Sequence, residues 1–285
     1  MRSLLSLSLV LLLATGCSGL RETVDPTVKW SASEFYEEAH AAMNEGNYET
    51  AIDYFTKLEA RYPYGRYAQQ AQIETIYAHY KAQEPAAAIA AADRFIRLHP
   101  RHPNVDYAYY MRGLASFEPG SNFLERLFPQ DGSKRDPRSA RESFRYFEEL
   151  VKRFPKSEYS EDAVQRMRYL RNGLARHELH VADYYLRRGA YLAAANRARY
   201  VVENYQQTPA VPEGLGVMVR AYRVMGLDDL AADARRVLQM NYPDHPVVAS
   251  LGDAPAEGIE VGTREPVPED PAEPSFWDRV IPDLW

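Results

Sequence analysis

The side chains best suited to chemistry lie in one short run, His177-Glu178-Leu179-His180, followed by Asp183. Imidazole and carboxylate groups are the ligands that zinc uses in hydrolases. The spacing differs from that of the zincins, in which two histidines four residues apart share one face of a helix. We therefore interpret these residues as packed or solvated side chains of a helix, and we keep a metal-dependent hydrolase as the least favoured hypothesis.

No other residue pattern in the chain is typical of catalysis. The acidic pairs Glu37-Glu38, Glu148-Glu149 and Asp228-Asp229 point to different faces of a helix and cannot converge on one reacting group. The sequence also lacks a phosphate-binding loop, a nucleophile elbow and a dinucleotide-binding glycine pattern. We expect a protein that is not an enzyme, with no catalytic residues, no metal site and no bound cofactor.

Cys17 is the only cysteine in the 285 residues, and it follows an export signal. Residues 1–16 have Arg2, then an apolar run from Leu4 to Leu13, then small residues, which is typical of a signal peptide and too short for a permanent membrane span. A lone cysteine excludes a disulfide framework. Its position resembles the lipobox of bacterial lipoproteins, which implies that Cys17 becomes the first mature residue and carries diacylglycerol and an acyl chain such as palmitate. By the same resemblance, Ser18 implies release to the outer membrane.

The rest of the chain is organised around a repeat first seen between Ser31 and Pro63. Two amphipathic helical segments are separated there by Gly46-Asn47-Tyr48, and a proline ends the second. A helix pair this short cannot bury its apolar faces alone, so it must stack on copies of itself. The set resembles the tetratricopeptide repeat, whose period is about 34 residues. The copies are marked by an aromatic residue or histidine before proline: Tyr62-Pro63, His99-Pro100, Phe154-Pro155, Tyr242-Pro243 and, more loosely, Tyr205 with Pro209.

We therefore expect an all-α fold, a tetratricopeptide-repeat solenoid of about five helix pairs. Residues 17–32 are expected to form a lipidated tether, unstructured from Leu20 to Lys29, and residues 33–155 to hold the first three repeats. An insertion near residues 118–136 carries an apolar run, Phe123 to Phe128, that either folds back or contacts a partner. Residues 156–251 hold repeats 4 and 5. Their apolar stripe predicts one continuous helix from Ser160 to Arg187, roughly 42 Å long.

Tyrosines are crowded into the first half of the chain. Most of them are expected to be core and inter-repeat packing residues, because the tetratricopeptide pattern itself requires aromatic side chains. Some should line the concave face with their hydroxyls exposed, which suits the binding of an extended peptide. The tyrosines predicted to bind a substrate peptide are Tyr64, Tyr67, Tyr77 and Tyr80.

The composition changes in the tail, residues 252–285. Between Asp253 and Asp283 nine acidic residues face two arginines among six prolines, so we expect an unfolded acidic linker. This segment alone carries −7, the whole net charge that remains after the signal peptide is lost, and the folded body is close to neutral. That argues against nucleic acid as a partner. Six large apolar side chains between Phe276 and Trp285 predict a short peptide that docks on a hydrophobic groove, near the insertion or on another subunit.

Several motifs together resemble the BamD family, the tetratricopeptide lipoproteins of the β-barrel assembly machinery of Gram-negative bacteria. The resemblance runs from the lipobox to about Tyr242, covers the insertion only loosely and excludes the tail. The motifs that carry it are Tyr62-Pro63-Tyr64-Gly65, Arg94-Phe95-Ile96-Arg97-Leu98, His102-Pro103-Asn104-Val105-Asp106-Tyr107, Tyr110-Met111-Arg112-Gly113-Leu114, Asp136-Pro137 and Val181-Ala182-Asp183-Tyr184-Tyr185.

The resemblance implies a non-enzymatic scaffold, anchored by lipid to the outer membrane and facing the periplasm. It implies that repeats 1 to 3 capture unfolded outer-membrane proteins, that repeats 4 and 5 dock on the periplasmic domains of BamA, and that BamC and other assembly lipoproteins are further partners. Asn196 and Arg197 match the family's BamA-contacting position; from the residues alone, Arg197 would be a solvated side chain that pairs with nothing. The alternative is a tetratricopeptide lipoprotein that coordinates peptidoglycan or envelope-division enzymes. An envelope hydrolase using His177 and His180 is less favoured.

Overall fold

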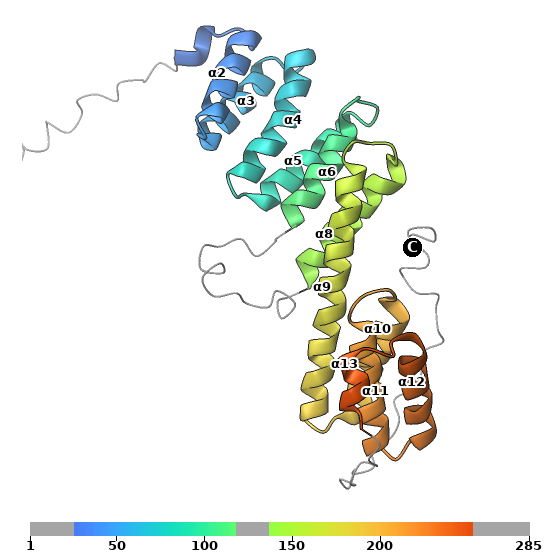
Figure 1. Ribbon diagram of the computed structural model, residues 1–285. Coiled ribbons are helices and arrows are strands. Elements are labelled where there is room, and N and C mark those ends of the chain that lie inside the picture. Colours follow the sequence, from blue (N-terminus) through green and yellow to red (C-terminus); the bar gives the residue numbers. More distant parts are fainter. Residues whose placement is uncertain (1–25, 118–136, 253–285) are drawn as a thin grey trace, which may run out of the picture. The chain divides into compact units, whose positions relative to one another are not determined.

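A computed structural model describes residues 26–117 and 137–252, and every regular element in these ranges is a helix (Figure 1). These residues form two compact units that divide between Ala71 and Gln72, within helix α4. The predicted all-α fold is confirmed for the described residues. The elements are η1 (Pro26–Lys29), α2 (Ala32–Asn44), α3 (Tyr48–Arg61), α4 (Arg66–Lys81), α5 (Pro85–Leu98), α6 (Val105–Ser116), α8 (Arg138–Arg153), α9 (Ser160–Arg187), α10 (Tyr191–Asn204), α11 (Val211–Val224), α12 (Asp228–Asn241) and α13 (Pro246–Ser250).

The first unit is built on the antiparallel pair α2 and α3. Ser31 and Glu34 form a capping box, in which the Ser31 hydroxyl accepts from the Glu34 amide and the Glu34 carboxylate accepts from the Ser31 amide. Gly46 adopts a φ of +79° in the turn between the helices, a conformation that side chains with a Cβ rarely adopt. Phe35 and Phe55 are fully buried between the two helices together with small alanines. The predicted helix pair is therefore confirmed.

The predicted unstructured tether is wrong in its last residues. Pro26–Lys29 form a 3₁₀ helix that is fixed to the first unit by Arg61, whose guanidinium donates to the carbonyl oxygens of Thr27 and Val28. Trp30 adds edge-to-face contacts with Phe35 and Tyr54, and its carbonyl accepts from the Tyr62 hydroxyl at 2.9 Å. These long-range contacts order a segment whose own composition does not favour structure.

The aromatic or histidine residues before proline do end helices, as predicted. Tyr62, His99, Phe154 and Tyr242 are C-caps, and each backbone N–H donates to the carbonyl four residues earlier. Tyr205, before the looser Pro209, ends α10 in the same way. Proline restrains the residue before it to extended backbone, which is why the helix cannot continue there.

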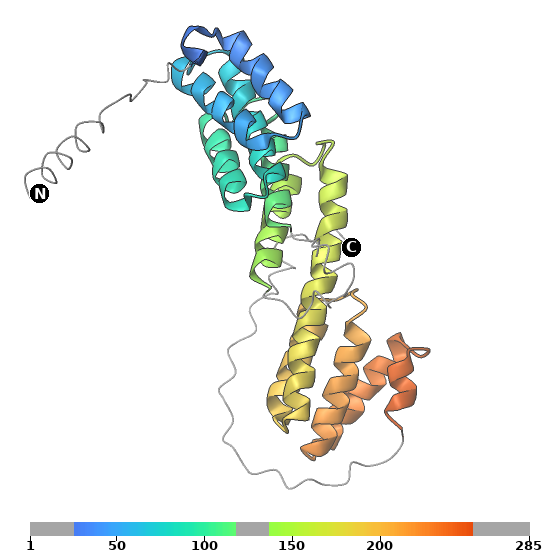
Figure 2. The same cartoon turned by 90° about the vertical axis from the view of Figure 1, so that its left-hand side faces the viewer.

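The second unit is organised along α9, the predicted helix from Ser160 to Arg187, which is confirmed at 28 residues (Figure 2). It packs on α8 and on α10, with further contacts to α11. Gly173, in the middle of the helix, does not interrupt it. The continuous buried stripe includes Met167, Leu174 and Ala182, so α9 is part of both the upstream and the downstream cores.

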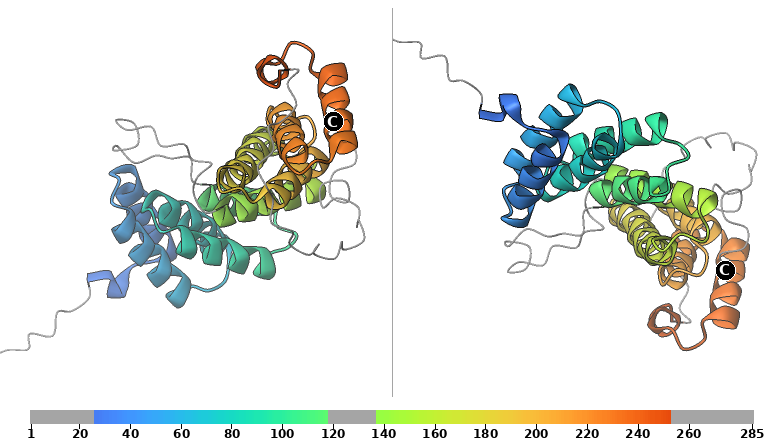
Figure 3. Two further views of the ribbon diagram at one scale, coloured as in Figure 1. Left: turned by 90° about the horizontal axis from the view of Figure 1, so that it is seen from below. Right: turned by 90° about the horizontal axis from the view of Figure 1, so that it is seen from above.

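The chain after α10 continues with α11 and α12, and α11 contacts both α10 and α12 (Figure 3). A short helix, α13, follows that the repeat pattern did not predict. It is held because Val247 packs against Gly216, where a side chain would clash with the valine, and because Arg223 donates to the carbonyl of Leu251 at 2.8 Å. Helix α13 therefore packs against the apolar cluster that α11 and α12 form at the end of the described chain.

Three predictions fall outside the described residues: the signal peptide and lipidated Cys17, the insertion near 118–136 with its Phe123 to Phe128 run, and the tail with its terminal apolar peptide. In the parts of the chain that are described, no helix is both long and apolar enough to cross a membrane.

Candidate functional site

A buried carboxylate on α9 joins two arginines from different helices. Glu178 has a side chain that is 3% exposed, and its Oε1 accepts from Arg141 of α8 at 3.2 Å while its Oε2 accepts from Arg197 of α10 at 2.9 Å. The arginine side chains are 54% and 47% exposed. We call these three residues the Glu178 fork.

The position of Glu178 follows from the period of α9. Leu174, Glu178 and Ala182 are spaced four residues apart and all are buried, so the carboxylate lies on the core-facing stripe of the helix. A carboxylate there is costly unless it is paired and hydrogen-bonded. Arg141 and Arg197 supply those bonds, and they also connect α8, α9 and α10.

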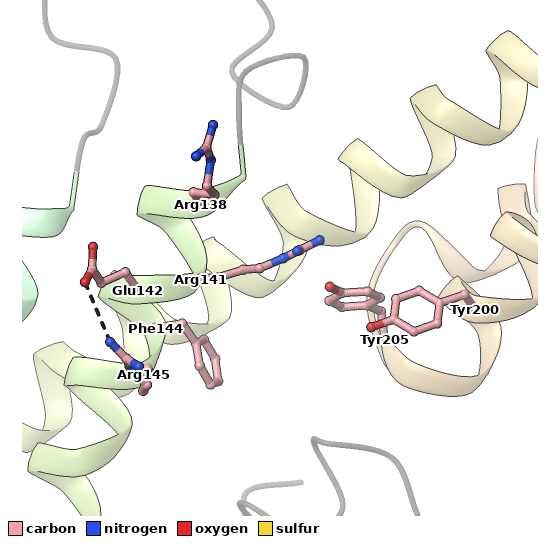
Figure 4. Close-up of a pocket in the computed structure, with 7 residues that line it drawn as sticks. All are labelled: Arg138, Arg141, Glu142, Phe144, Arg145, Tyr200 and Tyr205. Atoms are coloured by element: carbon pink, nitrogen blue, oxygen red, sulfur yellow. Dashed lines mark ion pairs between the residues drawn. The ribbon is translucent and has the colours of Figure 1, made fainter. Parts of the chain in front are cut away.

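Arg141 also lines a pocket of about 450 Å³ in the second unit (Figure 4). One side of the pocket comes from the first turns of α8 and the other from the C-terminal part of α10. In Figure 4 the guanidinium of Arg141 extends from α8 towards the two tyrosines. The lining residues are Arg138, Arg141, Glu142, Phe144, Arg145, Tyr200 and Tyr205.

The two tyrosines of the pocket stay protonated. Burial raises the pKa of the Tyr205 phenol, and the neighbouring Tyr200 phenol and Glu178 carboxylate raise it further. Burial also raises the pKa of Tyr200, again with a contribution from Glu178. Both rings therefore present neutral hydroxyl groups beside the arginines.

The electrostatic character of this site is positive. Arg138, Arg141 and Arg145 line the pocket against a single lining carboxylate, Glu142, which pairs with Arg145 at 3.6 Å. Guanidinium groups bind carboxylates in a planar, two-pronged geometry. The site can therefore bind anions.

Comparison with known proteins identifies the family. Residues 29–238 match the YfiO family, described as outer membrane lipoprotein. A relative from Neisseria meningitidis serogroup A is 46% identical over 238 residues, covering 82% of this chain and 89% of the relative. Relatives from Xylella fastidiosa and Vibrio cholerae are each 40% identical, covering 82% of this chain and 80% and 95% of their own lengths. All three are named outer membrane protein assembly factor BamD. This chain belongs to the BamD family of outer membrane lipoproteins.

The residues that match the BamD family's partner-contacting position lie on α10. Arg197 is not the unpaired, solvated side chain that reasoning from the residues alone suggested, because Glu178 holds it at 2.9 Å. Asn196 is exposed, and its Oδ1 accepts from Arg199 at 3.1 Å one turn further along the helix. Contact of Asn196 and Arg197 with a partner stays a prediction.

The side chains of the run from His177 to His180 have interaction partners within the protein. Each oxygen of Glu178 accepts a hydrogen bond from an arginine, so this carboxylate is already paired with two cations. His177 and His180 each have other interactions. Among the residues that the structure describes, no group of three histidine, cysteine, aspartate or glutamate side chains is placed to hold a metal ion.

The tyrosines predicted to bind peptide have different surroundings. In the first unit Tyr64 is 91% exposed in the turn before α4, whereas Tyr67 is half-buried and packs at 5.6 Å from the ring of Tyr36. In the second unit Tyr77 and Tyr80 are partly buried against the core around Ile76 and Phe95. Tyr64 is thus placed as a surface residue, and the other three combine packing with partial exposure.

Reasoning from the sequence missed the basic pocket and the buried Arg112. Arg138, Arg141 and Arg145 follow one face of α8 at helical spacing, which was the available signal. Arg112, which is buried, pairs with Asp93 at 2.7 Å and with Glu149, and its guanidinium lies 4.3 Å from the centre of the Tyr146 ring. Arg112 joins α5, α6 and α8 in the same way that the Glu178 fork joins α8, α9 and α10.

Proposed function

We propose that this protein is a non-enzymatic scaffold of the outer-membrane β-barrel assembly machinery, which binds unfolded outer-membrane proteins and the periplasmic domains of BamA during folding and insertion. The observation that carries the proposal is family membership. The relatives are named outer membrane protein assembly factors, and the similarity to them covers most of this chain and of theirs. The stacked helix pairs support it, because repeats of this kind present extended surfaces for peptides and partner domains. BamC and other assembly lipoproteins are proposed as further partners, and nucleic acid is not.

We place the protein at the outer membrane, facing the periplasm, with a covalent lipid on Cys17 as its anchor and no other cofactor. The family's description as an outer membrane lipoprotein supports this placement. Two or more acyl chains anchor a protein stably, whereas one gives only marginal binding.

Docking on BamA is assigned to the exposed surface of α10 at Asn196 and Arg197. The geometry favours such a role, because Arg197 uses one terminal nitrogen on Glu178 and is half exposed. Truncating one partner of an interfacial ion pair typically costs about 2 to 5 kcal/mol. We expect Arg197→Leu to weaken co-purification with BamA strongly, because a carboxylate of the partner that pairs with Arg197 then loses its charge-assisted hydrogen bonds.

The control for this experiment is Arg236→Leu, on α12, an exposed arginine paired with Asp233 away from Asn196 and Arg197. It removes the same charge from a different helix and should leave co-purification unchanged. The helix content of both variants should stay close to the parent value, whereas Arg197→Leu should lower the melting temperature, because the buried Glu178 carboxylate loses one of its two charge-assisted hydrogen bonds. Normal recovery of BamA with Arg197→Leu would refute the assignment, and recovery of peptidoglycan or division enzymes instead of BamA would favour the alternative scaffold.

Substrate binding is assigned to the tyrosine-rich half. We expect a photo-crosslinking amino acid at Tyr64 to capture the C-terminal strand of a nascent barrel protein, because this side chain is exposed and amphipathic. Positions Tyr67, Tyr77 and Tyr80 should give weaker capture, since they are partly buried. The adducts are identified by mass spectrometry.

The control position for crosslinking is Tyr169, an exposed tyrosine on α9. It tests whether exposure alone produces adducts, and it should not capture the barrel strand. Adducts at Tyr64 that contain only lipoproteins such as BamC would assign this surface to a partner rather than to substrate.

A further inference from the structure

The basic pocket and the Arg197 surface are connected by one buried carboxylate. We propose that Glu178 presents Arg141 and Arg197 together, so that the pocket beside Arg141 receives a carboxylate side chain of the same partner that docks on Arg197. This inference rests on the proposed function and extends it from one arginine to a two-arginine receptor with a defined cavity.

The fork geometry is the first support. Each oxygen of Glu178 accepts from a different arginine, so one buried group sets the positions of two guanidiniums that come from α8 and α10. A guanidinium carries five N–H donors, and the bond to Glu178 engages one nitrogen of each arginine. About half of each side chain is exposed, so each arginine has further N–H donors to offer to a partner.

The charge balance is the second support. The ion pairs of the site join three arginines, Arg141, Arg145 and Arg197, to two carboxylates, Glu142 and Glu178. The excess is positive, and it lies in a partly enclosed site where charges interact more strongly than in bulk water. A carboxylate that enters the pocket would reduce this imbalance.

The shape and lining are the third support. A volume of about 450 Å³ accommodates one or two side chains, and Phe144, Tyr200 and Tyr205 give it an aromatic wall. The methylene groups of a glutamate can lie on these rings while its carboxylate meets Arg141. The occupant that the geometry favours is an acidic side chain of the docking partner, because Arg141, which lines the pocket, is joined to Arg197 by the same Glu178 carboxylate.

Glu178 is a positioning residue in this scheme, and its neutralisation separates two explanations. If only net charge matters, Glu178→Gln removes a negative charge and should strengthen binding of an acidic partner. If the fork positions the arginines, the same change should weaken binding, because an amide has only one acceptor oxygen for two guanidiniums. The two explanations therefore predict opposite signs.

The experiment measures the affinity of the full mature protein for the purified periplasmic region of BamA at several salt concentrations. We expect Arg141→Gln and Glu178→Gln each to raise the dissociation constant about tenfold or more, equivalent to about 1.4 kcal/mol. Arg141→Gln should also reduce the dependence of affinity on salt, since one ion pair is lost. The control is Arg236→Gln on α12, an exposed arginine paired with Asp233 outside the site, and it should change neither quantity.

Each outcome is decisive. If the parent protein does not bind the BamA region, the proposed function fails. If Arg197→Gln weakens binding but Arg141→Gln and Glu178→Gln do not, the proposed function stands and this inference is overturned. A melting temperature measured for each variant separates loss of the site from loss of the fold, and Arg141→Gln serves as the variant at a half-exposed position if Glu178→Gln fails to fold.

The acidic tail is the competing occupant, and one further variant tests it. The full chain is made with the nine acidic residues between 253 and 283 changed to amides. If the pocket binds the partner, this change leaves the effect of Arg141→Gln in place. If the neutralised tail raises the affinity for the BamA region and Arg141→Gln then has no effect, the tail occupies the pocket and the inference is overturned.

Discussion

Replacing Phe147 with alanine should lower the free energy of unfolding of the second unit by about 3 to 5 kcal/mol. Phe147 lies on α8, its side chain is 0% exposed, and it packs in the core beside Phe144, Leu150 and Met167. Removing the ring forfeits its transfer free energy and leaves a cavity that the rigid helices can fill only in part. Urea denaturation of the mature chain, followed by circular dichroism, measures the change.

The reason for expecting so large an effect is the close contact between α6 and α8. A Cβ built at Gly113 would lie 2.5 Å from the Phe147 ring, and the Ser143 hydroxyl donates to the Gly113 carbonyl at 2.9 Å. Gly113→Ala should therefore destabilise the protein, although alanine in a helix interior is ordinarily better than glycine by about 1 kcal/mol. Tyr169→Ala, at an exposed position of α9, is the control for loss of an aromatic ring. A change below 1 kcal/mol for Phe147→Ala would show that this helix contact is not close-packed.

The helical framework could be predicted because its signals are local. The proline after Tyr62, His99, Phe154 and Tyr242 fixes each helix end by restricting the backbone of the preceding residue. The apolar period of α9 continued past Gly173, and one glycine costs too little to break a helix that is buried along its length.

The Glu178 fork could not be predicted because it depends on contacts between distant residues. Glu178 was recognised only as a member of a histidine-rich run, whereas its partners lie 37 residues earlier and 19 residues later in the chain. No local pattern indicates that two arginines on neighbouring helices will meet one buried carboxylate. The same holds for Arg61, which orders Pro26–Lys29 across a separation of 33 to 34 residues.

The candidate site residues came from two sources. The tyrosines were chosen by their residue type and their crowding in the first half of the chain. Arg197 was chosen by resemblance to the family, and the structure adds that it is held by a buried partner. Tyr64, Tyr67, Tyr77 and Tyr80 share a residue type but range from fully exposed to partly buried, so residue type alone did not indicate which of them can contact a peptide.

The second large effect is expected at the anchor, where Cys17→Ser should abolish lipid attachment. A thiolate is a far better nucleophile than a serine hydroxyl, so the substituted side chain should not accept diacylglycerol. The covalent lipid is the membrane-binding feature on which the proposal relies. The protein should accumulate as an uncleaved or soluble precursor.

Metabolic labelling with palmitate and fractionation of membranes measure this effect. The parent protein should carry label and sediment with the outer membrane, whereas Cys17→Ser should carry none. Ser18→Ala is the matched control, since it alters the adjacent residue and keeps the thiol, and it should be labelled normally. An uncleaved precursor can still sediment through its apolar signal peptide, so the label rather than sedimentation decides the result. Unchanged labelling of Cys17→Ser would exclude this cysteine as the lipidation site.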